Sequence, residues 1–531
     1  MYRPPRSTQP AAALTVARSP ASRPRPHPFP SPSGRGARGE GRRRHPWLLW
    51  AIILLAFALR VYHLDFQSLW RDEVDALRFA TRPLAQLLDT FTKPGENGPL
   101  FFLLLRPWLQ VFGQSETALR FPSVLWGTLS VPLTWVLARR LLRFGATATA
   151  HAGAAGVSTL AMLLTATSPY LVWYSQEGKM YALVVALALG SVLALLWALT
   201  AAAAGVRLRW LVYIALTSLG FYLHVMFVLL LPVHAVLFAL GWPSTRRHWR
   251  GALLALASFV LPYLPLVWWQ WRLFTSPTFD PGFSPVSLPR MFAILLVAFG
   301  RGMRGVPTIG LVSVWVFLLL AALLLAGGKP GSWRRPVIIL AAWLLVPPLL
   351  LFVITLRVPL FNDRYLIYLG PAFYLLSAVG AYLVAQRSRA LAAGALLLAL
   401  SLNLVGVGGQ AVTPIKADFR TAAAFVQAQR GPTDVLIFLH PYSRFTFAYY
   451  AGWDYAWREA PFTNDRQRVS LDSTGAVLTR LVQGADHVWL IESEAETWDR
   501  RAFNRQWLDA HGEPVVTHAV TGVRVTRWAL R

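Results

Sequence analysis

Two adjacent carboxylates, Asp72 and Glu73, lie in the stretch LDFQSLWRDEVDALRF at residues 64–79, directly after the first long apolar run. Burial, a neighbouring charge or a bound cation each shift a carboxyl pKa, so one of the pair could serve as a general base or a metal ligand. The same pair is also typical of a helix start, where acids favour the positive end of the helix dipole. The pair alone leaves both interpretations open.

The composition indicates a membrane protein. The 531 residues are 55% hydrophobic and 14% charged, and the mean hydropathy is +0.45. A net charge of +27 could indicate nucleic-acid binding, but the arginines stand in short clusters between apolar runs, as membrane-surface anchors do. The sequence therefore predicts no nucleic-acid partner. The absence of cysteine excludes disulfides, thiolate metal sites and a cysteine nucleophile.

Apolar runs of roughly 17 to 25 residues are long enough to cross a bilayer. We identify about eleven candidates, and the chain is therefore predicted to be a polytopic α-helical membrane protein. They lie near residues 47–63, 117–138, 152–170, 180–199, 210–223, 226–242, 252–271, 308–327, 337–356, 366–385 and 391–409.

The distribution of arginine and lysine predicts the orientation, because short cytoplasmic loops retain positive charge. The basic tail, residues 1–46, is predicted to be disordered and cytoplasmic. The inner loops then carry Arg139–Arg143, Arg207–Arg209, Arg246–Arg250, Lys329–Arg335 and Arg387–Arg389. The outer loops carry the acids, at 64–116, 173–179, around Asp280 and at 361–365. This pattern predicts a multi-pass protein of the plasma or inner membrane.

Two further apolar segments, 97–113 and 285–304, are interrupted by arginine, and we expect both to be amphipathic helices on the outer leaflet. After about residue 412 the composition becomes that of a soluble domain. Helices at 417–430 and 474–483 and strands at 435–439 and 487–492 predict a small extracytoplasmic α/β domain over 413–531, following a membrane domain over 47–412. We interpret this domain as a lid or an acceptor-recognition module.

Several polar residues fall at the outer ends of the predicted spans, where one cavity could be shared among them. A substrate with a phosphate and a long apolar tail would suit such a cavity, with cations such as Arg364 and Lys179 holding the phosphate. Simpler interpretations remain: Arg364 with Tyr365 as an interface anchor, Glu177 and Lys179 as a turn cap, His224 as a packing residue. The set comprises Asp72, Glu73, Glu96, Asn97, Glu177, Lys179, His224 and Arg364.

Five segments in order carry a resemblance to a known family. They are SLWRDE at 68–73, NGPLFFLLLRPWLQVFGQSETALRFPSVLWG at 97–127, SPYLVWYSQEGKMYAL at 168–183, YLH at 222–224 and DRYLIYLGPAFYLL at 363–376. The chain resembles bacterial membrane glycosyltransferases of family 39, which are similar to the protein O-mannosyltransferases and the lipid A aminoarabinose transferase and have the GT-C architecture. The resemblance covers most of residues 47–410.

This resemblance implies an enzyme of the cell envelope that transfers a sugar from a polyprenyl-phosphate carrier to a lipid, glycan or protein acceptor on the outer face. It implies that Asp72 and Glu73 are the catalytic carboxylates, with Asp72 as base or acceptor-orienting group. It places Arg364 and Tyr365 near the carrier phosphate. Asn97 stands where relatives carry histidine or lysine, and Lys179 stands where they carry arginine. Some relatives bind a divalent metal, for which Glu96 and His224 are possible ligands here.

A transporter or flippase of a lipid-linked or small solute is the alternative from another class. It should have charged residues near the bilayer midplane and two repeated halves. The sequence shows no internal repeat, and its acids lie at the ends of the predicted spans. A third possibility is an assembly protein of the envelope without activity. Release of polyprenyl phosphate from a sugar donor separates the enzyme from both alternatives.

Overall fold

A computed structural model of the chain describes residues 46–531 with short gaps. The gaps are 92–96, 145–150, 201–204, 243, most of 261–283, 304–308, 328–332 and 464–468. The predictions made for the tail up to residue 45, for Glu96, for the loop around Asp280 and for Lys329 fall outside the described residues.

A helix is found at every apolar run that the sequence analysis identified. Among the described residues, five helices are long and apolar enough to cross a membrane, and the bent pair α6 (His151–Thr167) and α7 (Pro169–Ser175) would make a sixth. The total of about eleven spans stays a prediction. In chain order the helices are α1 (Pro46–Val61), α5 (Glu116–Leu141), α6 (His151–Thr167), α8 (Tyr181–Leu199), α9 (Val206–Phe221), η2 (Val225–Leu230) with α10 (Leu231–Leu240), η3 (Arg246–His248) with α11 (Trp249–Val260), α14 (Ile309–Leu325), α15 (Arg334–Thr355), η5 (Asp363–Leu369) with α16 (Gly370–Ala385), and α17 (Arg389–Val412).

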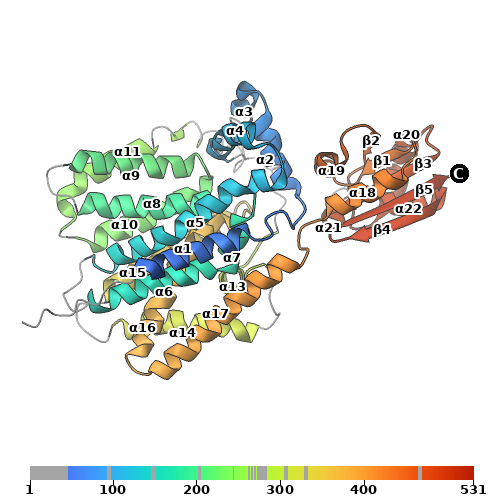
Figure 1. The fold of residues 1–531 in the computed structure, drawn as a ribbon. Coiled ribbons are helices and arrows are strands. Elements are labelled where there is room, and N and C mark those ends of the chain that lie inside the picture. The colour runs from blue at the N-terminus through green and yellow to red at the C-terminus, as the bar shows by residue number, and fades with distance from the viewer. Residues whose placement is uncertain are drawn as a thin grey trace, which may run out of the picture. The chain divides into compact units, whose positions relative to one another are not determined.

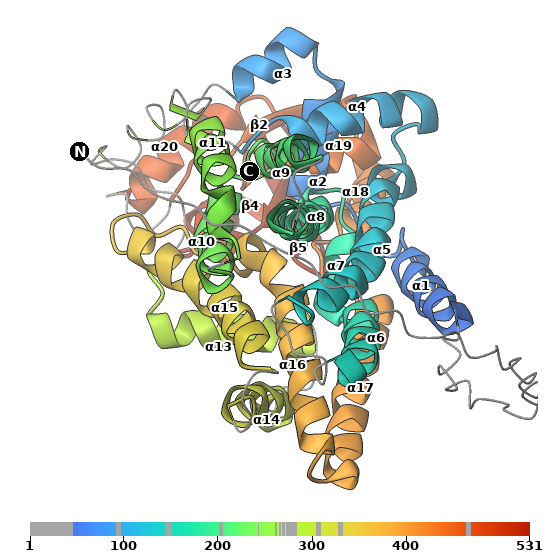
Figure 2. The same ribbon diagram turned by 90° about the vertical axis from the view of Figure 1, so that its left-hand side faces the viewer.

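The helix bundle has buried and peripheral members (Figures 1 and 2). Helix α8 packs between α5 and α9, and α16 packs against α6, α14 and α17. The helices differ in the buried share of an 18-residue apolar stretch in each. This share is 78% in α8 and 89% in η5 with α16, but only 28% in α17. Since a helix that is apolar all round needs burial in protein or lipid, the exposed sides of α17 are suited to lipid contact.

Four shorter helices lie between the long ones. Helices α2 (Arg71–Thr81), α3 (Leu84–Thr90) and α4 (Leu100–Phe112) make up the first predicted outer loop, and α13 (Leu288–Arg301) follows much later. Helices α4 and α13 coincide with the two predicted amphipathic segments, and their place at a leaflet stays a prediction. Helices α6 and α7 are bent by 56° at the Ser168–Pro169 junction, where Pro169 removes a backbone donor and fixes φ.

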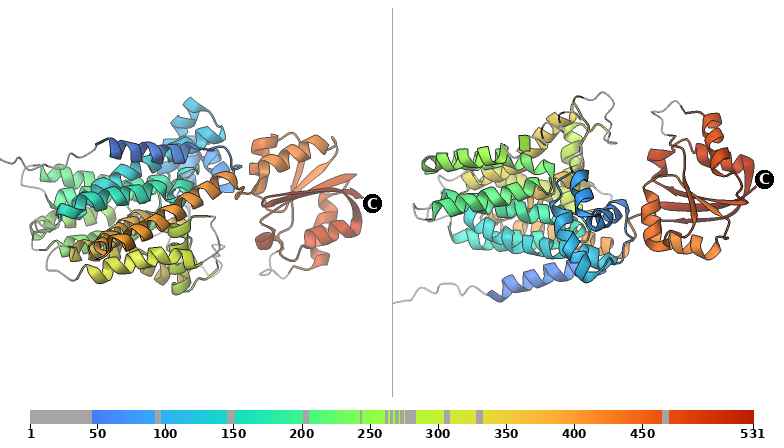
Figure 3. Two further views of the ribbon diagram at one scale, coloured as in Figure 1. Left: turned by 60° about the horizontal axis from the view of Figure 1, so that its bottom comes forward. Right: turned by 90° about the horizontal axis from the view of Figure 1, so that it is seen from above.

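The C-terminal residues form an α/β domain with one mixed sheet (Figure 3). The strand order is β2-β1-β3-β5-β4, with β1 parallel to β2 and β3, and β5 antiparallel to β3 and β4. Alternate residues of β1 and β3 face two separate apolar clusters, one with α18 and α19 and the other with α20 and α22. The predicted helices and strands of this region are confirmed. The elements are α18 (Phe419–Gln429), β1 (Val435–Phe438), α19 (Ser443–Ala451), β2 (Ala456–Glu459), α20 (Leu471–Leu481), β3 (His487–Ser493), α21 (Ala495–Trp498), α22 (Phe503–His511), β4 (Gly512–Val520) and β5 (Val523–Leu530).

Candidate active site

Asp72 lies in the first turn of α2 and is paired with arginine. Its Oδ2 is 3.0 Å from Nη1 of Arg364, a residue 292 positions later in η5, and its Oδ1 is 3.7 Å from Nε of Arg71. Burial by itself would raise the pKa of Asp72, but the charges of Lys179, Arg364 and Arg71 outweigh burial and hold the pKa below its usual range. Asp72 is therefore a carboxylate, and a hydrogen-bond acceptor, at neutral pH.

Arg364 is held at the start of η5 by its neighbours. Asn362 caps this helix, its side-chain oxygen accepting the Arg364 backbone N–H at 3.3 Å. The guanidinium lies 5.3 Å from the ring of Trp70 and 5.5 Å from that of Tyr181. Its Nε is buried without a hydrogen-bond partner among the described residues. A buried donor without a partner is costly, so this nitrogen is available to a ligand oxygen.

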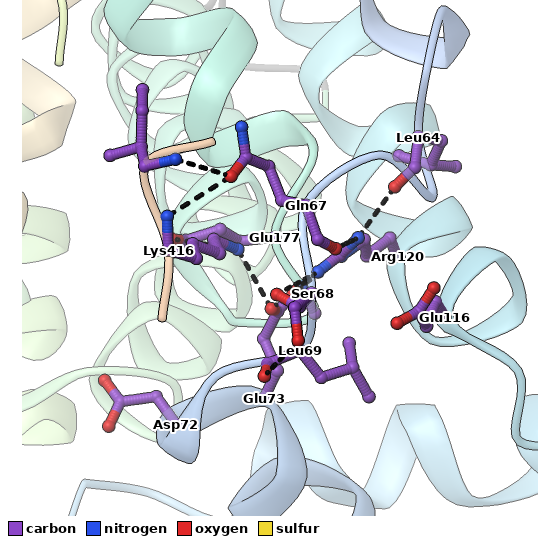
Figure 4. A network of polar contacts seen from close by, with 12 residues as sticks. Leu64, Gln67, Ser68, Leu69, Asp72, Glu73, Glu116, Arg120, Glu177 and Lys416 are labelled. Atoms are coloured by element: carbon purple, nitrogen blue, oxygen red, sulfur yellow. Dashed lines mark hydrogen bonds and ion pairs between the residues drawn. The ribbon is translucent and has the colours of Figure 1, made fainter. Parts of the chain in front are cut away.

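Glu73 is fully buried and both of its oxygens are occupied (Figure 4). Arg120 of α5 donates to both oxygens at 2.8 Å, Lys416 Nζ donates to Oε2 at 2.9 Å, and the Gly178 N–H donates to Oε1 at 2.9 Å. In Figure 4 the Asp72 carboxylate lies apart from this network. The two neighbouring acids are thus in different surroundings: Glu73 is held by Arg120, Lys416 and Gly178, whereas Asp72 contacts Arg364 and Arg71.

The Glu73 network also fixes the chain that leaves the bundle after α17. The side-chain oxygen of Gln67 accepts the backbone N–H groups of Ile415 and Lys416, at 2.9 and 3.2 Å. Arg120 donates to the backbone carbonyls of Leu64 and Gln67, both at 2.8 Å. The loop before α2 and the linker to the C-terminal domain are therefore joined through one set of buried charges.

The electrostatics of Glu73 predict acid sensitivity. Burial opposes ionisation, but Arg120 and Lys416 overcome it and lower the pKa of Glu73 to about 2 from 4.5. A carboxyl with a depressed folded-state pKa stabilises the fold above its unfolded pKa, and this contribution is lost as pH falls toward the folded value. We expect the thermal midpoint of the purified protein to fall between about pH 4.5 and pH 2, with a smaller fall in Glu73→Gln; an equal fall in both would contradict this assignment.

Glu177 and Lys179 lie in the turn between α7 and α8. Glu177 Oε1 is 3.5 Å from Lys416 Nζ, and its Oε2 is buried without a hydrogen-bond partner in the described part of the chain. Burial raises the pKa of Glu177, and the charges of Glu73 and Asp72 raise it further against the effect of Lys416. The Lys179 backbone carbonyl accepts from Ser123 at 3.1 Å, and its ammonium lies 5.8 Å from the Phe102 ring.

Asn97, His224 and Tyr365 lie together beside this group. The Asn97 side-chain oxygen accepts the Val225 N–H at 3.4 Å, and the His224 ring is 5.1 Å from the Tyr365 ring. Burial, and then the charge of Arg364, lower the pKa of His224 to about 3, so this imidazole is neutral. Its Nδ1 accepts the Met226 N–H at 3.2 Å.

The described residues do not form a metal centre. No three His, Asp or Glu side chains among them lie close enough together to hold a metal ion. His224 has one nitrogen engaged by the backbone, and Glu96, the other residue considered as a ligand, is outside the described residues. The described residues alone therefore do not fit a divalent ion, and we derive no step through one.

A cavity of about 520 Å³ is lined by Arg71, Glu177 and Arg364; Asp72 is not part of its lining but contacts Arg364 and Arg71, which are. Four of the residues that line it carry buried polar atoms without partners among the described residues: Trp70, Glu177, Arg364 and Thr446. Such atoms are rare in folded proteins and indicate a place where a ligand or water completes the hydrogen bonding. The remaining lining comes from Trp173, Tyr174, Met303, Asn362, Asp363, Ile415, Lys416, Ala417, Phe419, His440, Ser443, Ser493, Glu494 and Gly522.

Solved structures share this arrangement of helices over almost the whole chain. ArnT from Cupriavidus metallidurans in the apo state has a TM-score of 0.55 at 14% identity, covering 91% of this chain and 97% of that one. The same protein bound to undecaprenyl phosphate gives 0.55 at 13% identity, with the same coverage. The chain has the GT-C fold. An oligosaccharyltransferase from Archaeoglobus fulgidus, tethered to an acceptor peptide, gives 0.51 at 12% identity, covering 92% and 74%.

Sequence comparison adds no relative: no protein-family model matches the chain, and no curated protein matches it. The GT-C fold therefore rests on the arrangement of elements in space. The resemblance inferred from five short segments agrees with this fold, which is the architecture expected from it.

Within the GT-C fold the structure adds residues that sequence reasoning missed. Lys416, one of only four lysines in the sequence, contacts both Glu73 and Glu177. Arg71 bridges Asp72 to the C-terminal domain, where its Nη1 is 2.8 Å from Nε2 of His440. The scarcity of lysine was the only available signal for Lys416, and Arg71 had none beyond its place next to Asp72.

Proposed function

We propose that this protein is a membrane glycosyltransferase that moves a sugar from a polyprenyl-phosphate carrier to an acceptor on the extracytoplasmic face. The observation that carries the proposal is the contact between Asp72 and Arg364, an arginine that lines the polar cavity. ArnT, which shares the fold, has been solved bound to undecaprenyl phosphate, a lipid with a phosphate and a long apolar tail. A carboxylate beside an arginine with a free donor suits such a substrate.

The carrier phosphate would bind Arg364 through its unpartnered Nε, with Lys179 adding positive charge. A second, almost wholly apolar cavity of about 280 Å³ suits part of the prenyl chain. It is lined by Leu369 and Phe373, which follow Arg364 in the same span, and by leucines of α13, α14 and α15. Phosphate and tail would thus be held by consecutive turns of one span.

In the proposed reaction an acceptor oxygen attacks the anomeric carbon of the sugar. A new carbon–oxygen bond forms as the bond to the phosphate oxygen breaks, and polyprenyl phosphate leaves with the bonding electrons. Asp72 accepts the proton of the acceptor hydroxyl, and Arg364 stabilises the charge that develops on the leaving phosphate. Glu73 acts as a positioning residue, because its oxygens are already occupied by Arg120, Lys416 and Gly178.

The orientation of the site is also a proposal. The basic clusters at Arg139–Arg143 and Arg207–Arg209 favour the cytoplasmic side, because positive loops are retained there. Arg120 lies near the first residues of α5, and the Arg139–Arg143 cluster lies at its last residues. Helix α9 runs the other way: the Arg207–Arg209 cluster lies at its first residues, and His224 follows its last. The polar cavity at Arg364 would then face the extracytoplasmic side. So would the C-terminal domain, which is joined to the Glu73 network through Lys416.

The function is tested by incubating the purified protein in lipid nanodiscs with polyprenyl-phosphate sugars and measuring released polyprenyl phosphate. A glycosyltransferase releases it, whereas a transporter, a flippase or an inactive assembly protein releases none. Release that occurs equally in a preparation from host membranes without this protein would show that a contaminating enzyme is responsible.

Replacing Arg364 by alanine is expected to weaken donor binding by about 10- to 100-fold, because a charge-assisted contact to phosphate is lost. The apparent KM for the donor measures this effect. Arg357, an exposed arginine a few residues before η5, provides the control Arg357→Ala, which should behave as wild type. Equal donor binding in Arg364→Ala and wild type would make Arg364 only a membrane anchor.

A further inference from the structure

One wall of the polar cavity comes from the C-terminal domain, at the end of two of its strands. Strands β1 and β3 are parallel neighbours, so their carboxyl ends meet at the same edge of the sheet. His440 follows β1, Ser493 ends β3 and Glu494 comes next. Ligands of sheets with parallel strands bind at this edge. We call this group, with Ser443 and Thr446 of α19, the strand-end wall; all five residues line the cavity.

The strand-end wall has hydroxyl groups and no positive charge. Burial, and then the charge of Arg71, lower the pKa of His440 to about 4, so its imidazole is neutral at physiological pH. Glu494 is the only acidic residue in the wall, and its side chain is 41% exposed. The carboxylate lies 3.5 Å from Arg71 and 3.8 Å from His440 Nε2.

Two features of the wall indicate that it meets a ligand. The hydroxyl of Thr446 is buried without a hydrogen-bond partner among the described residues, although its residue lines the cavity. Glu494 has a positive φ of 53°, which non-glycine residues rarely adopt and which is found more often at functional sites. The ring of Trp498 lies 4.1 Å from that of His440 and supports its position.

We propose that the strand-end wall binds the acceptor, and that the acceptor is an uncharged glycan whose sugar hydroxyl is the nucleophile. This inference rests on the proposed function and names its substrate class. Carboxylates and hydroxyls are the groups that hydrogen-bond sugar hydroxyls, while Trp70 and Trp173 supply apolar surface in the same cavity. The hydroxyl gives its oxygen to the new glycosidic bond and its proton to Asp72.

An acceptor phosphate or carboxylate fits this wall poorly. It would face Glu494, and the cations of the cavity already have carboxylate partners: Arg71 with Asp72 and Glu494, and Lys416 with Glu73 and Glu177. Like charges at close range in a partly buried site are unfavourable. Arg364 is the other arginine that lines the cavity and pairs with Asp72. In the proposed function it binds the donor phosphate.

The inference is tested by binding without any donor, so that it does not depend on turnover. Full-length protein in nanodiscs is applied to printed neutral oligosaccharides and to their phosphorylated and carboxylated counterparts. We expect neutral glycans to bind at least about tenfold more tightly than their anionic counterparts. Glu494→Gln should weaken binding of the neutral glycans about tenfold or more, because hydrogen bonds to a charged group are lost. Glu496→Gln, at an exposed position two residues later, should leave it unchanged.

Thr446 provides a second variant pair that keeps the fold. Thr446→Val removes an unpartnered buried hydroxyl at almost constant volume, so it should not lower the thermal midpoint. It should weaken glycan binding several-fold, and Thr446→Ser should restore it. The inference is overturned if neutral glycans are not preferred and the variants do not weaken their binding. It is also overturned if anionic sugars bind more tightly than neutral ones.

Release of polyprenyl phosphate, measured on the same preparations, separates the two proposals. Release with a phosphate or peptide acceptor, and without glycan binding, would overturn the acceptor inference alone. Glycan binding through the strand-end wall without release from any donor would overturn the proposed function and leave a glycan-binding protein.

Discussion

Replacing Asp72 by asparagine is expected to lower turnover about 10²- to 10⁴-fold, the range in which a positioned general base contributes. Asparagine keeps the shape of the side chain but cannot accept the acceptor proton. Because the Asp72 side chain is 17% exposed and is outside the buried Glu73 network, the fold should persist. Turnover is measured as released polyprenyl phosphate at saturating donor, with the thermal midpoint recorded for each variant.

Asp75 provides a matched control in the same helix. It lies one turn from Asp72 and pairs with Arg78 at 2.9 Å, whereas Asp72 pairs with the cavity-lining Arg364. Asp75→Asn should therefore retain turnover. If Asp72→Asn turns over normally at saturating donor and only binds the donor more weakly, Asp72 orients Arg364 and is not the base.

The second large effect is expected at Glu73, and it concerns stability. Glu73→Gln would remove the carboxylate partner of the buried Arg120 and leave the buried Lys416 with Glu177 alone. Breaking a buried ion pair by removing one partner typically costs about 3–5 kcal/mol. We expect a strong fall in the thermal midpoint and in the amount of protein in the membrane.

A double substitution tests whether this cost comes from uncompensated charge. Adding Lys416→Met to Glu73→Gln removes one of the two buried cations that contact Glu73. Part of the lost stability should therefore return. Glu116→Gln is the comparison, because Glu116 pairs with the more exposed Arg420 and should cost less. A Glu73→Gln protein of normal stability and no activity would instead assign Glu73 a catalytic role, as the family resemblance implied.

Local patterns were sufficient for most elements of the fold. The apolar runs predicted helices because a bilayer-length run must satisfy its backbone hydrogen bonds internally. Alternation of helical and strand patterns after residue 412 predicted the C-terminal domain, because side-chain period reports secondary structure directly. The bend at Pro169 and the presence of two clusters around one sheet needed the structure.

The sequence by itself determined the class of the protein, the helices and the candidate residues Asp72, Glu73, Glu177 and Arg364, because these depend on composition and local pattern. Only the tertiary structure decided which carboxylate is available. Consecutive residues of a helix point about 100° apart, so Glu73 turns into the buried charges while Asp72 meets Arg364. The contacts of Lys416 and of the strand-end wall also come only from the tertiary structure. Their partners Glu73 and Arg71 are hundreds of residues away in the chain, and no local pattern encodes a long-range contact.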